Sequence, residues 1–433
     1  GSIIILTESI NAFGSTLGNY NLIGGEGYDL LTGDIGDDVI YGADGNDVLD
    51  GASGSDTLAG GNGNDSITGG TGNDSLQGNP GNDSLKGEEG SDSITGGAGN
   101  DSLVGGSGDD VYFFSTGDVV SGETITESGG GGTDVIAILT STDFSLMDAA
   151  SFDEIEEIRF AGSNQIGTVT GAQLTGETIV LTETAAGISE LIVNVVAGST
   201  VNLANLTATT FTIGSDILTI NVENGSANIT YPSFPVTIVG SDSGNDTLTG
   251  TPNADTLDGK DGNDTIDGRG AADNLIGGSG DDVYLFNTND VDIGESITEN
   301  VGGGTDVIAI VTTTDFSNLS SDSVDEIEQI RFAGANQTGT FTGAQLTGET
   351  LLLTETAAGT SNVIINVGLG TTATFANITA STFTSGSDTI TINGSTGNEN
   401  ITGPNLATTI DGDDGADNLI GGSGDDVYLF NTN

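Results

Sequence analysis

The chain has 433 residues, of which 64 are Asp or Glu and only 5 are Lys or Arg, so its formal net charge is -59. Nucleic acid and anionic membranes repel so acidic a chain, and we expect it to bind neither. Cys and His are absent, which excludes disulfide bonds, cysteine-based zinc sites and nucleophilic catalysis that relies on either residue. No apolar run approaches the roughly 18 residues of a membrane-spanning helix, so we expect no membrane span.

Residues 1–23 form an entry segment. Its last part, residues 18–23, fits the nine-residue repeat that follows, but Tyr20 stands where every later copy in the first array has Asp. We therefore expect a degenerate first turn that lacks its carboxylate.

Residues 24–113 form a first array, in which one nine-residue phrase is repeated ten times without insertion or deletion. In the copy at residues 60–68, glycine stands at positions 1, 2 and 4, aspartate at position 6 and an aliphatic residue at position 8. A fixed period of this kind indicates a repeat architecture. The position-6 aspartates are Asp29, Asp38, Asp47, Asp56, Asp65, Asp74, Asp83, Asp92, Asp101 and Asp110.

Each part of the phrase predicts a local structure. Glycines at positions 1, 2 and 4 allow positive φ, so the first six residues are predicted to form a tight turn whose carbonyls point toward one spot. Positions 7–9 are predicted to form a short strand in which only the position-8 side chain points inward. Two phrases make one coil, and stacked coils place each aspartate beside those two copies away. Such a set of oxygens suits a hard cation.

The phrase resembles the Gly-Gly-x-Gly-x-Asp-x-aliphatic-x repeat of the RTX, or hemolysin-type, calcium-binding family. The resemblance implies a parallel β-roll that binds multiple Ca2+ ions between its turns, with the position-6 aspartates as ligands. It also implies one-step (type I) secretion to the cell exterior. Residues 24–113 hold 18 acids and one lysine, and about eight calcium ions between ten loops would nearly cancel that charge. We therefore expect calcium binding and folding to be coupled.

The rest of the chain alternates spacers and arrays. A Thr/Val/Ile-rich spacer at 114–238 is duplicated by a second at 286–393, so that the segment 132–138 recurs as 304–310. Between them, residues 239–285 form a less regular second array, and residues 394–433 begin a third whose first two aspartate positions hold Glu and Thr. The metal ligands predicted in these arrays are Asp246, Asp255, Asp264, Asp273, Asp282, Asp417 and Asp426.

The phrase Gly-Gly-Ser-Gly-Asp-Asp-Val-Tyr closes each array, starting at Gly105, Gly277 and Gly421. We interpret it as the transition from array to spacer. The short β-prone runs of the spacers are compatible with a β-sandwich or with further solenoid coils of about 20 residues. We favour the solenoid because the spacers enter the arrays without a linker. The predicted fold class is therefore all-β: parallel β-roll arrays alternating with β-solenoid-like spacers, with sandwich spacers as the alternative.

Paired carboxylates in the spacers are the strongest catalytic candidates. Those at residues 153–157 are compatible with a glycosidase pair, but we interpret them as a solvated acidic edge with Arg159 as its partner, repeated around Arg331. We therefore predict no enzymatic activity.

Three classes of function are compatible with these features. The favoured one is a calcium-binding structural protein of the bacterial cell surface, as in a surface layer, filament or matrix, which associates with itself into a sheet or fibre. The alternatives are the stalk of an RTX adhesin and the non-catalytic part of a secreted RTX toxin or enzyme. A cell-surface polysaccharide is a further candidate partner.

Overall fold

Successive coils of parallel strands build the chain. The computed structural model describes residues 2–5, 11–13, 18–127, 131–211, 216–223, 228–300, 303–383 and 387–429. Parts of the predicted entry segment and the end of the predicted third array lie outside these ranges. The chain divides into two compact units: Gly1–Val195, Thr200–Thr219 and Ile229–Pro232 form the first, and Val196–Ser199, Ile220–Asn228 and Ser233–Asn433 form the second.

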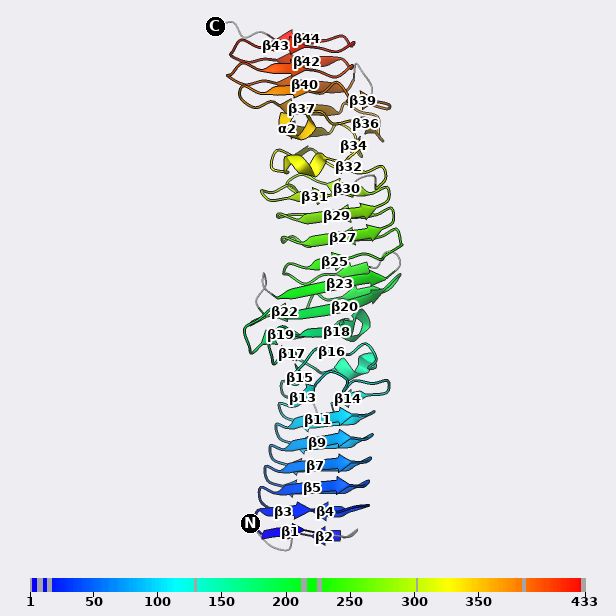
Figure 1. The fold of residues 1–433 in the computed structure, drawn as a ribbon, viewed down its shortest axis with the longest axis vertical. Coiled ribbons are helices and arrows are strands. Elements are labelled where there is room, and N and C mark those ends of the chain that lie inside the picture. The colour runs from blue at the N-terminus through cyan, green and yellow to red at the C-terminus, as the bar shows by residue number, and fades with distance from the viewer. Residues whose placement is uncertain are drawn as a thin grey trace. The chain divides into compact units, whose positions relative to one another are not determined.

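From β1 to β20, odd-numbered strands follow one another on one side of the coil and even-numbered strands on the other (Figure 1). One sheet contains β1 (Ser2–Ile5), β3 (Tyr20–Ile23), β5 (Val39–Asp44), β7 (Thr57–Asn62), β9 (Ser75–Pro80), β11 (Ser93–Ala98), β13 (Val111–Phe114), β15 (Val135–Ile138), β17 (Glu157–Phe160), β19 (Val180–Glu183) and β22 (Thr207–Ala208). The facing sheet contains β2 (Asn11–Phe13), β4 (Leu30–Thr32), β6 (Val48–Ser53), β8 (Ser66–Thr71), β10 (Ser84–Glu89), β12 (Ser102–Ser107) and β14 (Thr124–Thr126). Further strands of this region are β16 (Thr142–Asp143), β18 (Ile166–Thr170), β20 (Glu190–Val196), β21 (Thr200–Asn202), β23 (Ile217–Glu223) and β24 (Asn228–Thr230).

The second unit repeats this arrangement. One set of paired strands is β25 (Thr237–Val239), β27 (Thr256–Asp261), β29 (Asn274–Ser279) and β31 (Ser296–Thr298). A second is β26 (Thr247–Thr249), β28 (Thr265–Asp267), β30 (Val283–Phe286), β32 (Val307–Ile310), β34 (Gln329–Phe332), β36 (Leu352–Glu355) and β39 (Thr379–Ala380). The remaining sets are β33 (Thr314–Asp315), β35 (Thr338–Thr342), β37 (Asn362–Asn366), β40 (Thr389–Asn393), β42 (Thr408–Asp411) and β44 (Val427–Leu429), and β38 (Thr372–Thr374), β41 (Asn400–Thr402) and β43 (Asn418–Ile420).

The predicted all-β parallel solenoid is confirmed, in the spacers as well as in the arrays. In the first spacer β13, β15, β17 and β19 pair in parallel in that order, and β30, β32, β34 and β36 do the same in the second. A sandwich would need antiparallel sheets packed face to face. Helical segments are short: η1 (Ala149–Phe152), α1 (Gly171–Leu174), η2 (Ser321–Val324) and α2 (Gly343–Leu346). Within the described residues, no helix has the length and apolarity needed to cross a membrane.

The strands of the first array are longer than the sequence predicts. β8 covers positions 7–9 of one repeat and positions 1–3 of the next, so only positions 4–6 remain for the turn. The prediction of a six-residue turn and a three-residue strand is therefore wrong for β5 to β12. The reason is that successive coils also pair beyond position 9, as Ala52 does with Gly70.

In the first two arrays the core consists of the position-8 side chains from both sides of the coil, as predicted, whereas in the third array Leu419 is half-buried and Tyr428 is 37% exposed. From Leu31 to Tyr112 all ten are at most 1% exposed. Burying each contributes about 1.5–3 kcal/mol. The spacer coils are longer and hold aromatic side chains as well: the rings of Phe114 and Phe144 meet edge to face at 5.2 Å.

Candidate metal centres

The aspartates of the first array form two ladders, one for alternate copies. All ten are buried, at most 3% exposed. The Oδ1 atom of Asp65 accepts the backbone N–H of Asp47 at 2.7 Å, and Asp65 in turn donates its N–H to Oδ1 of Asp83 at 2.7 Å. The same bond recurs in each ladder as far as Asp110. The structure therefore brings together aspartates that lie two copies apart, as the coil length predicts.

The second carboxylate oxygen has no hydrogen-bond partner in most of the array. Buried Oδ2 atoms without a donor belong to Asp47, Asp56, Asp65, Asp74, Asp83, Asp92, Asp101 and Asp110. In the first two copies the backbone supplies a donor instead: Gly25 N–H to Asp29 Oδ2 at 2.8 Å and Asp34 N–H to Asp38 Oδ2 at 3.0 Å. A buried anionic oxygen without a hydrogen-bond donor destabilises the folded state. A row of such oxygens therefore indicates that a cation binds beside them.

At several of these aspartates, backbone oxygen lines the space beside the Oδ2 atom. A Cβ atom on Gly42 would collide with Oδ2 of Asp47 and would lie 2.5 Å from the carbonyl oxygen of Gly60, the first glycine of the next coil on that side. Gly51 and Gly78 stand in the same relation to their own aspartates and to the position-1 glycines of the next coil. Carboxylate and carbonyl oxygens gathered around a small space are the donor set that calcium prefers. The residues present therefore fit a calcium ion.

This geometry corrects the predicted role of the position-1 glycine. Gly61 and Gly63, at positions 2 and 4, have φ of 117° and 131°, as predicted, but Gly60 at position 1 does not adopt positive φ. It is glycine because a Cβ atom there would collide with Oδ2 of Asp65. Position 1 therefore requires glycine because the aspartate oxygen approaches its Cα closely, and not because the backbone adopts positive φ there.

The electrostatics of the ladders also favour a bound cation. The pKa values of Asp56, Asp83 and Asp92 are raised to about 7, mainly by burial and to a lesser extent by the charges of the aspartates one coil away, while a backbone hydrogen bond to each carboxylate acts in the opposite direction. At neutral pH, the buried negative charge of these carboxylates is compensated by either a bound proton or a bound metal ion. Calcium does so without requiring protonation.

The second array divides into two kinds of position. Oδ2 has no partner in Asp264, Asp273 and Asp282. In Asp246, by contrast, Oδ2 accepts bonds from the backbone and hydroxyl of Ser241, at 2.7 and 2.9 Å. Asp255 accepts the N–H and hydroxyl of Thr251 and the N–H of Val236. The last three aspartates of this array therefore resemble those of the first array, whereas the carboxylates of the first two accept hydrogen bonds from the protein on both oxygens or on Oδ2.

In the third array the two predicted ligands are only half-buried. Asp417 Oδ1 accepts the N–H of Glu399 at 3.0 Å, and Asp426 Oδ1 accepts that of Thr408 at 3.2 Å. Glu399 and Thr408 thus occupy ladder positions although neither is an aspartate.

The ladders continue into the spacers through acidic residues that the nine-residue period does not identify. The N–H of Asp101 donates to Glu123 at 2.9 Å, that of Asp110 to Asp134 at 2.9 Å, and that of Asp134 to Glu156 at 2.8 Å. The second spacer has the same bonds at Glu295, Asp306 and Glu328. The signal that could have found them is the duplication of the spacer, which preserves all of these acids at equivalent positions.

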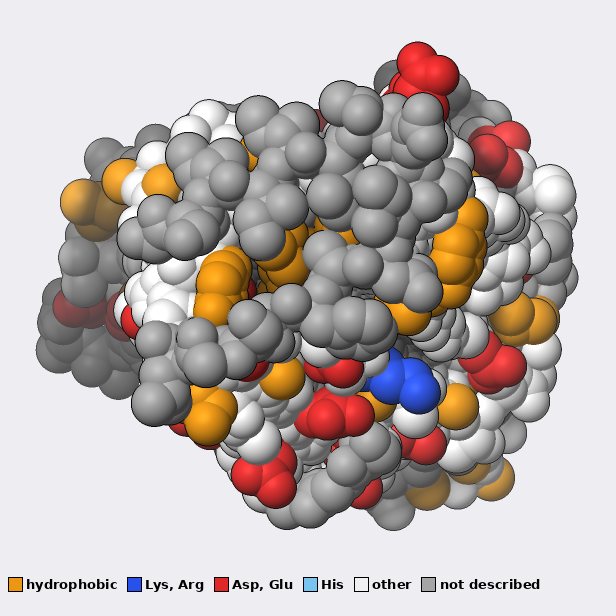
Figure 2. Space-filling model, turned by 90° about the horizontal axis from the view of Figure 1, so that it is seen from below, with side chains coloured by type: hydrophobic (Ala, Val, Ile, Leu, Met, Phe, Trp, Pro, Cys, Tyr) orange, Lys and Arg blue, Asp and Glu red, His pale blue; other side chains and the backbone are white. Residues whose placement is uncertain are grey.

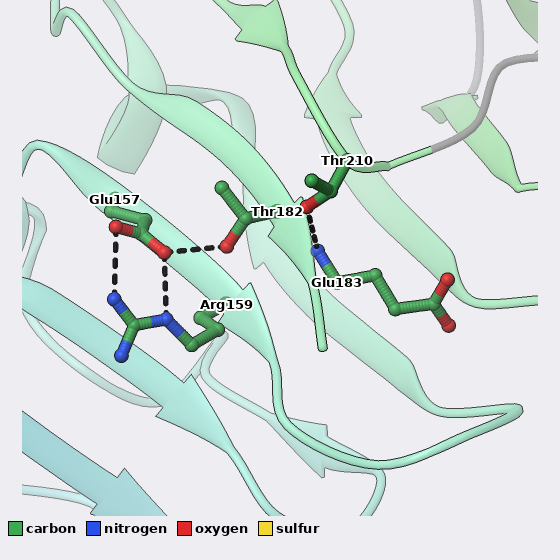
Figure 3. Close-up of polar contacts among 5 residues, drawn as sticks. All are labelled: Glu157, Arg159, Thr182, Glu183 and Thr210. Atoms are coloured by element: carbon green, nitrogen blue, oxygen red, sulfur yellow. Dashed lines mark hydrogen bonds and ion pairs between the residues drawn. The ribbon is translucent and has the colours of Figure 1, made fainter. Parts of the chain in front are cut away.

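The prediction of a solvated acidic edge is correct for Asp153 and Glu154, which are exposed, and the predicted pairing with Arg159 is correct for Glu157. Arg159 makes two hydrogen bonds to Glu157, of 2.7 and 3.0 Å, and Thr182 donates its hydroxyl to the same carboxylate (Figure 3). Glu156 instead belongs to the ladder, so its assignment to a solvated edge is wrong. The second spacer does not repeat the ion pair: Gln329 stands where the first has Glu157, and Arg331 has no ion pair among the described residues.

Fold and site together define a parallel β-solenoid whose turns carry stacked, calcium-type oxygen sites. Comparison with protein families identifies these repeats: the RTX calcium-binding nonapeptide repeat (4 copies) matches residues 18–49, 50–85, 77–112, 240–270, 249–284 and 407–429. The arrays belong to the RTX calcium-binding repeat family, as the pattern of the nine-residue repeat predicts. A search of curated proteins found no match.

Proposed function

We propose that this protein is an extracellular, calcium-binding structural protein whose arrays fold when calcium binds and which assembles at the cell surface. The observation that carries the proposal is the row of buried aspartate Oδ2 atoms that have no hydrogen-bond partner, several of them beside a backbone carbonyl oxygen of the next coil. Without calcium these charges oppose coil stacking, and with calcium they hold neighbouring coils together. A repeat solenoid with this role is a structural element, and we assign it no enzymatic activity.

A calcium titration followed by circular dichroism tests the folding step. We expect largely disordered arrays in excess chelator and a cooperative gain of β signal near the ~0.1–1 mM calcium that is typical of extracellular modules. Magnesium is the control, because it demands a stricter geometry and gives up its water reluctantly. A full β signal in chelator would refute calcium-dependent folding.

Assembly is the finer part of the proposal and rests on charge. The chain carries a formal charge of -59, and among the described side chains visible in Figure 2 acidic groups outnumber basic ones. Calcium lowers this charge, so it reduces repulsion between copies as well as within one. Secretion to the cell exterior supplies both the calcium and the neighbouring copies.

Electron microscopy of the same preparation with calcium and after chelation tests the assembly. We expect sheets or fibres at millimolar calcium that disperse when calcium is removed. Single particles at high protein concentration and millimolar calcium would contradict self-assembly and favour the adhesin stalk.

A further inference from the structure

A second kind of carboxylate cluster lies where each complete array meets its spacer. The first consists of Asp110, Glu127 and Asp134, whose carboxylate oxygens lie within 4.8 Å of one another. The same cluster recurs in the second unit as Asp282, Glu299 and Asp306. Only the first member of each belongs to a nine-residue repeat. The other two come from the spacer, so these clusters are not sites between two nonapeptide loops.

The closing phrase of each of the first two arrays positions the cluster. Its last residue, Tyr112, occupies the aliphatic position 8 and is fully buried. The Tyr112 hydroxyl donates to one oxygen of Glu127, and the other oxygen accepts the N–H of Gly106 at 3.2 Å. Asp134 is fixed by the N–H of Asp110. In the second unit Tyr284 donates to Glu299 in the same way. Tyr112 and Tyr284 therefore each hold a spacer glutamate against the last aspartate of the array.

An unpartnered buried oxygen points into each cluster. Asp110 and Asp282 are 0% exposed, and the Oδ2 atom of each has no hydrogen-bond partner in the described part of the chain. A Cβ atom on Gly105 would collide with Oδ2 of Asp110 and the Tyr112 hydroxyl, so glycine keeps this space open. Burial also raises the pKa of Glu127 to about 7, with further contributions from Asp134 and Asp110.

We propose that a hard divalent cation, for which calcium is the best match, binds at Asp110, Glu127 and Asp134 and again at Asp282, Glu299 and Asp306. Each of the three carboxylates offers one hard oxygen ligand, and calcium accepts such oxygens in a flexible geometry, without the strict octahedron that magnesium needs. Each ion ties the last coil of an array to the first part of its spacer. The inference rests on the proposed calcium binding and adds to it two sites outside the nonapeptide loops.

The test uses the full chain and the double variant Glu127→Gln with Glu299→Gln. Glutamine keeps the shape and an oxygen for the tyrosine hydroxyl but removes the charged ligand. Equilibrium dialysis at neutral pH should show two fewer calcium ions per chain than the wild type. The matched control is Glu177→Gln with Glu349→Gln, which makes the same charge change in both spacers, outside either cluster, and should lose none.

Terbium in place of calcium locates the ions independently of that variant. The chain has no Trp, so terbium emission must be excited through tyrosine, and Tyr112 and Tyr284 lie beside the proposed sites. The double variant Tyr112→Phe with Tyr284→Phe leaves all carboxylates in place, so it should keep both ions while the tyrosine-excited emission falls.

Unchanged calcium stoichiometry in the glutamine variant would overturn the inference and mean that the clusters hold protons. Undiminished emission from the phenylalanine variant would overturn it too. Failure of the wild type to bind any calcium would instead refute the proposed function.

Discussion

Replacing Asp65 by asparagine separates its role as a calcium ligand from its role in the ladder. In the wild type the N–H of Asp47 donates to Oδ1 of Asp65 at 2.7 Å, and the side-chain oxygen of asparagine can accept the same hydrogen bond. The substitution removes the negative charge of the carboxylate, whose Oδ2 atom has no partner. Loss of a charged ligand should lower affinity at that site by about tenfold, or about 1.4 kcal/mol. In chelator the variant should lose nothing, because Asp65 repels Asp47 and Asp83 there.

The observable shift is smaller than the change at the site. When about eight ions bind in one cooperative transition, the midpoint follows the geometric mean of the site affinities, so a tenfold loss at one site raises it by only about 1.3-fold. Calcium stoichiometry by equilibrium dialysis is therefore the primary assay, with the circular dichroism midpoint beside it. Asp65→Ala should destabilise the array more than Asp65→Asn does. It also leaves the buried N–H of Asp47 without an acceptor, which costs about 1–3 kcal/mol.

The control is Asp50→Asn, the same charge change at the half-buried position 9 of the repeat. We expect it to leave the stoichiometry unchanged. An equal loss of calcium in Asp50→Asn and Asp65→Asn would refute the assignment of position 6 as the ligand. So would a loss of structure in Asp65→Asn that is the same size with calcium and without it.

Three further predictions follow from the same geometry. Because burial raises the pKa of carboxyls such as Asp92 to about 7 from the ordinary 3.8, the metal-free fold binds protons more tightly than the unfolded chain. Its stability is therefore greatest below pH 3.8 and is lost as the pH rises through about 7; β signal in chelator should grow on acidification, and a signal independent of pH would contradict this. Gly60→Ala should raise the calcium midpoint, whereas Gly18→Ala, where a Cβ atom meets nothing within 4 Å, should not; equal midpoints would argue against the oxygen-lined space. Asp264→Asn should remove bound calcium, measured by dialysis, and Asp255→Asn should not, because Thr251 and Val236 already satisfy its oxygens; the reverse order would refute the division of the second array.

The sequence by itself determined the repeat, the coil made of two repeats, the buried column at position 8 and the aspartates that meet from coil to coil. These features are periodic, and in a solenoid each coil contacts its sequence neighbours, so a regular period translates directly into spatial register. The same reasoning correctly favoured solenoid spacers over a sandwich.

Only the tertiary structure decided which carboxylate oxygens remain without a donor. Asp255 and Asp264 occupy the same position in the phrase, yet Thr251 satisfies one while the other has an unpartnered Oδ2. The structure alone also brought Glu127 and Asp134 to Asp110, because the coil that follows Asp110 is longer than two repeats and the nine-residue period no longer gives the register. A period can predict which residues meet when every coil has the same length, but where the length changes, the meeting depends on the path of the backbone through space.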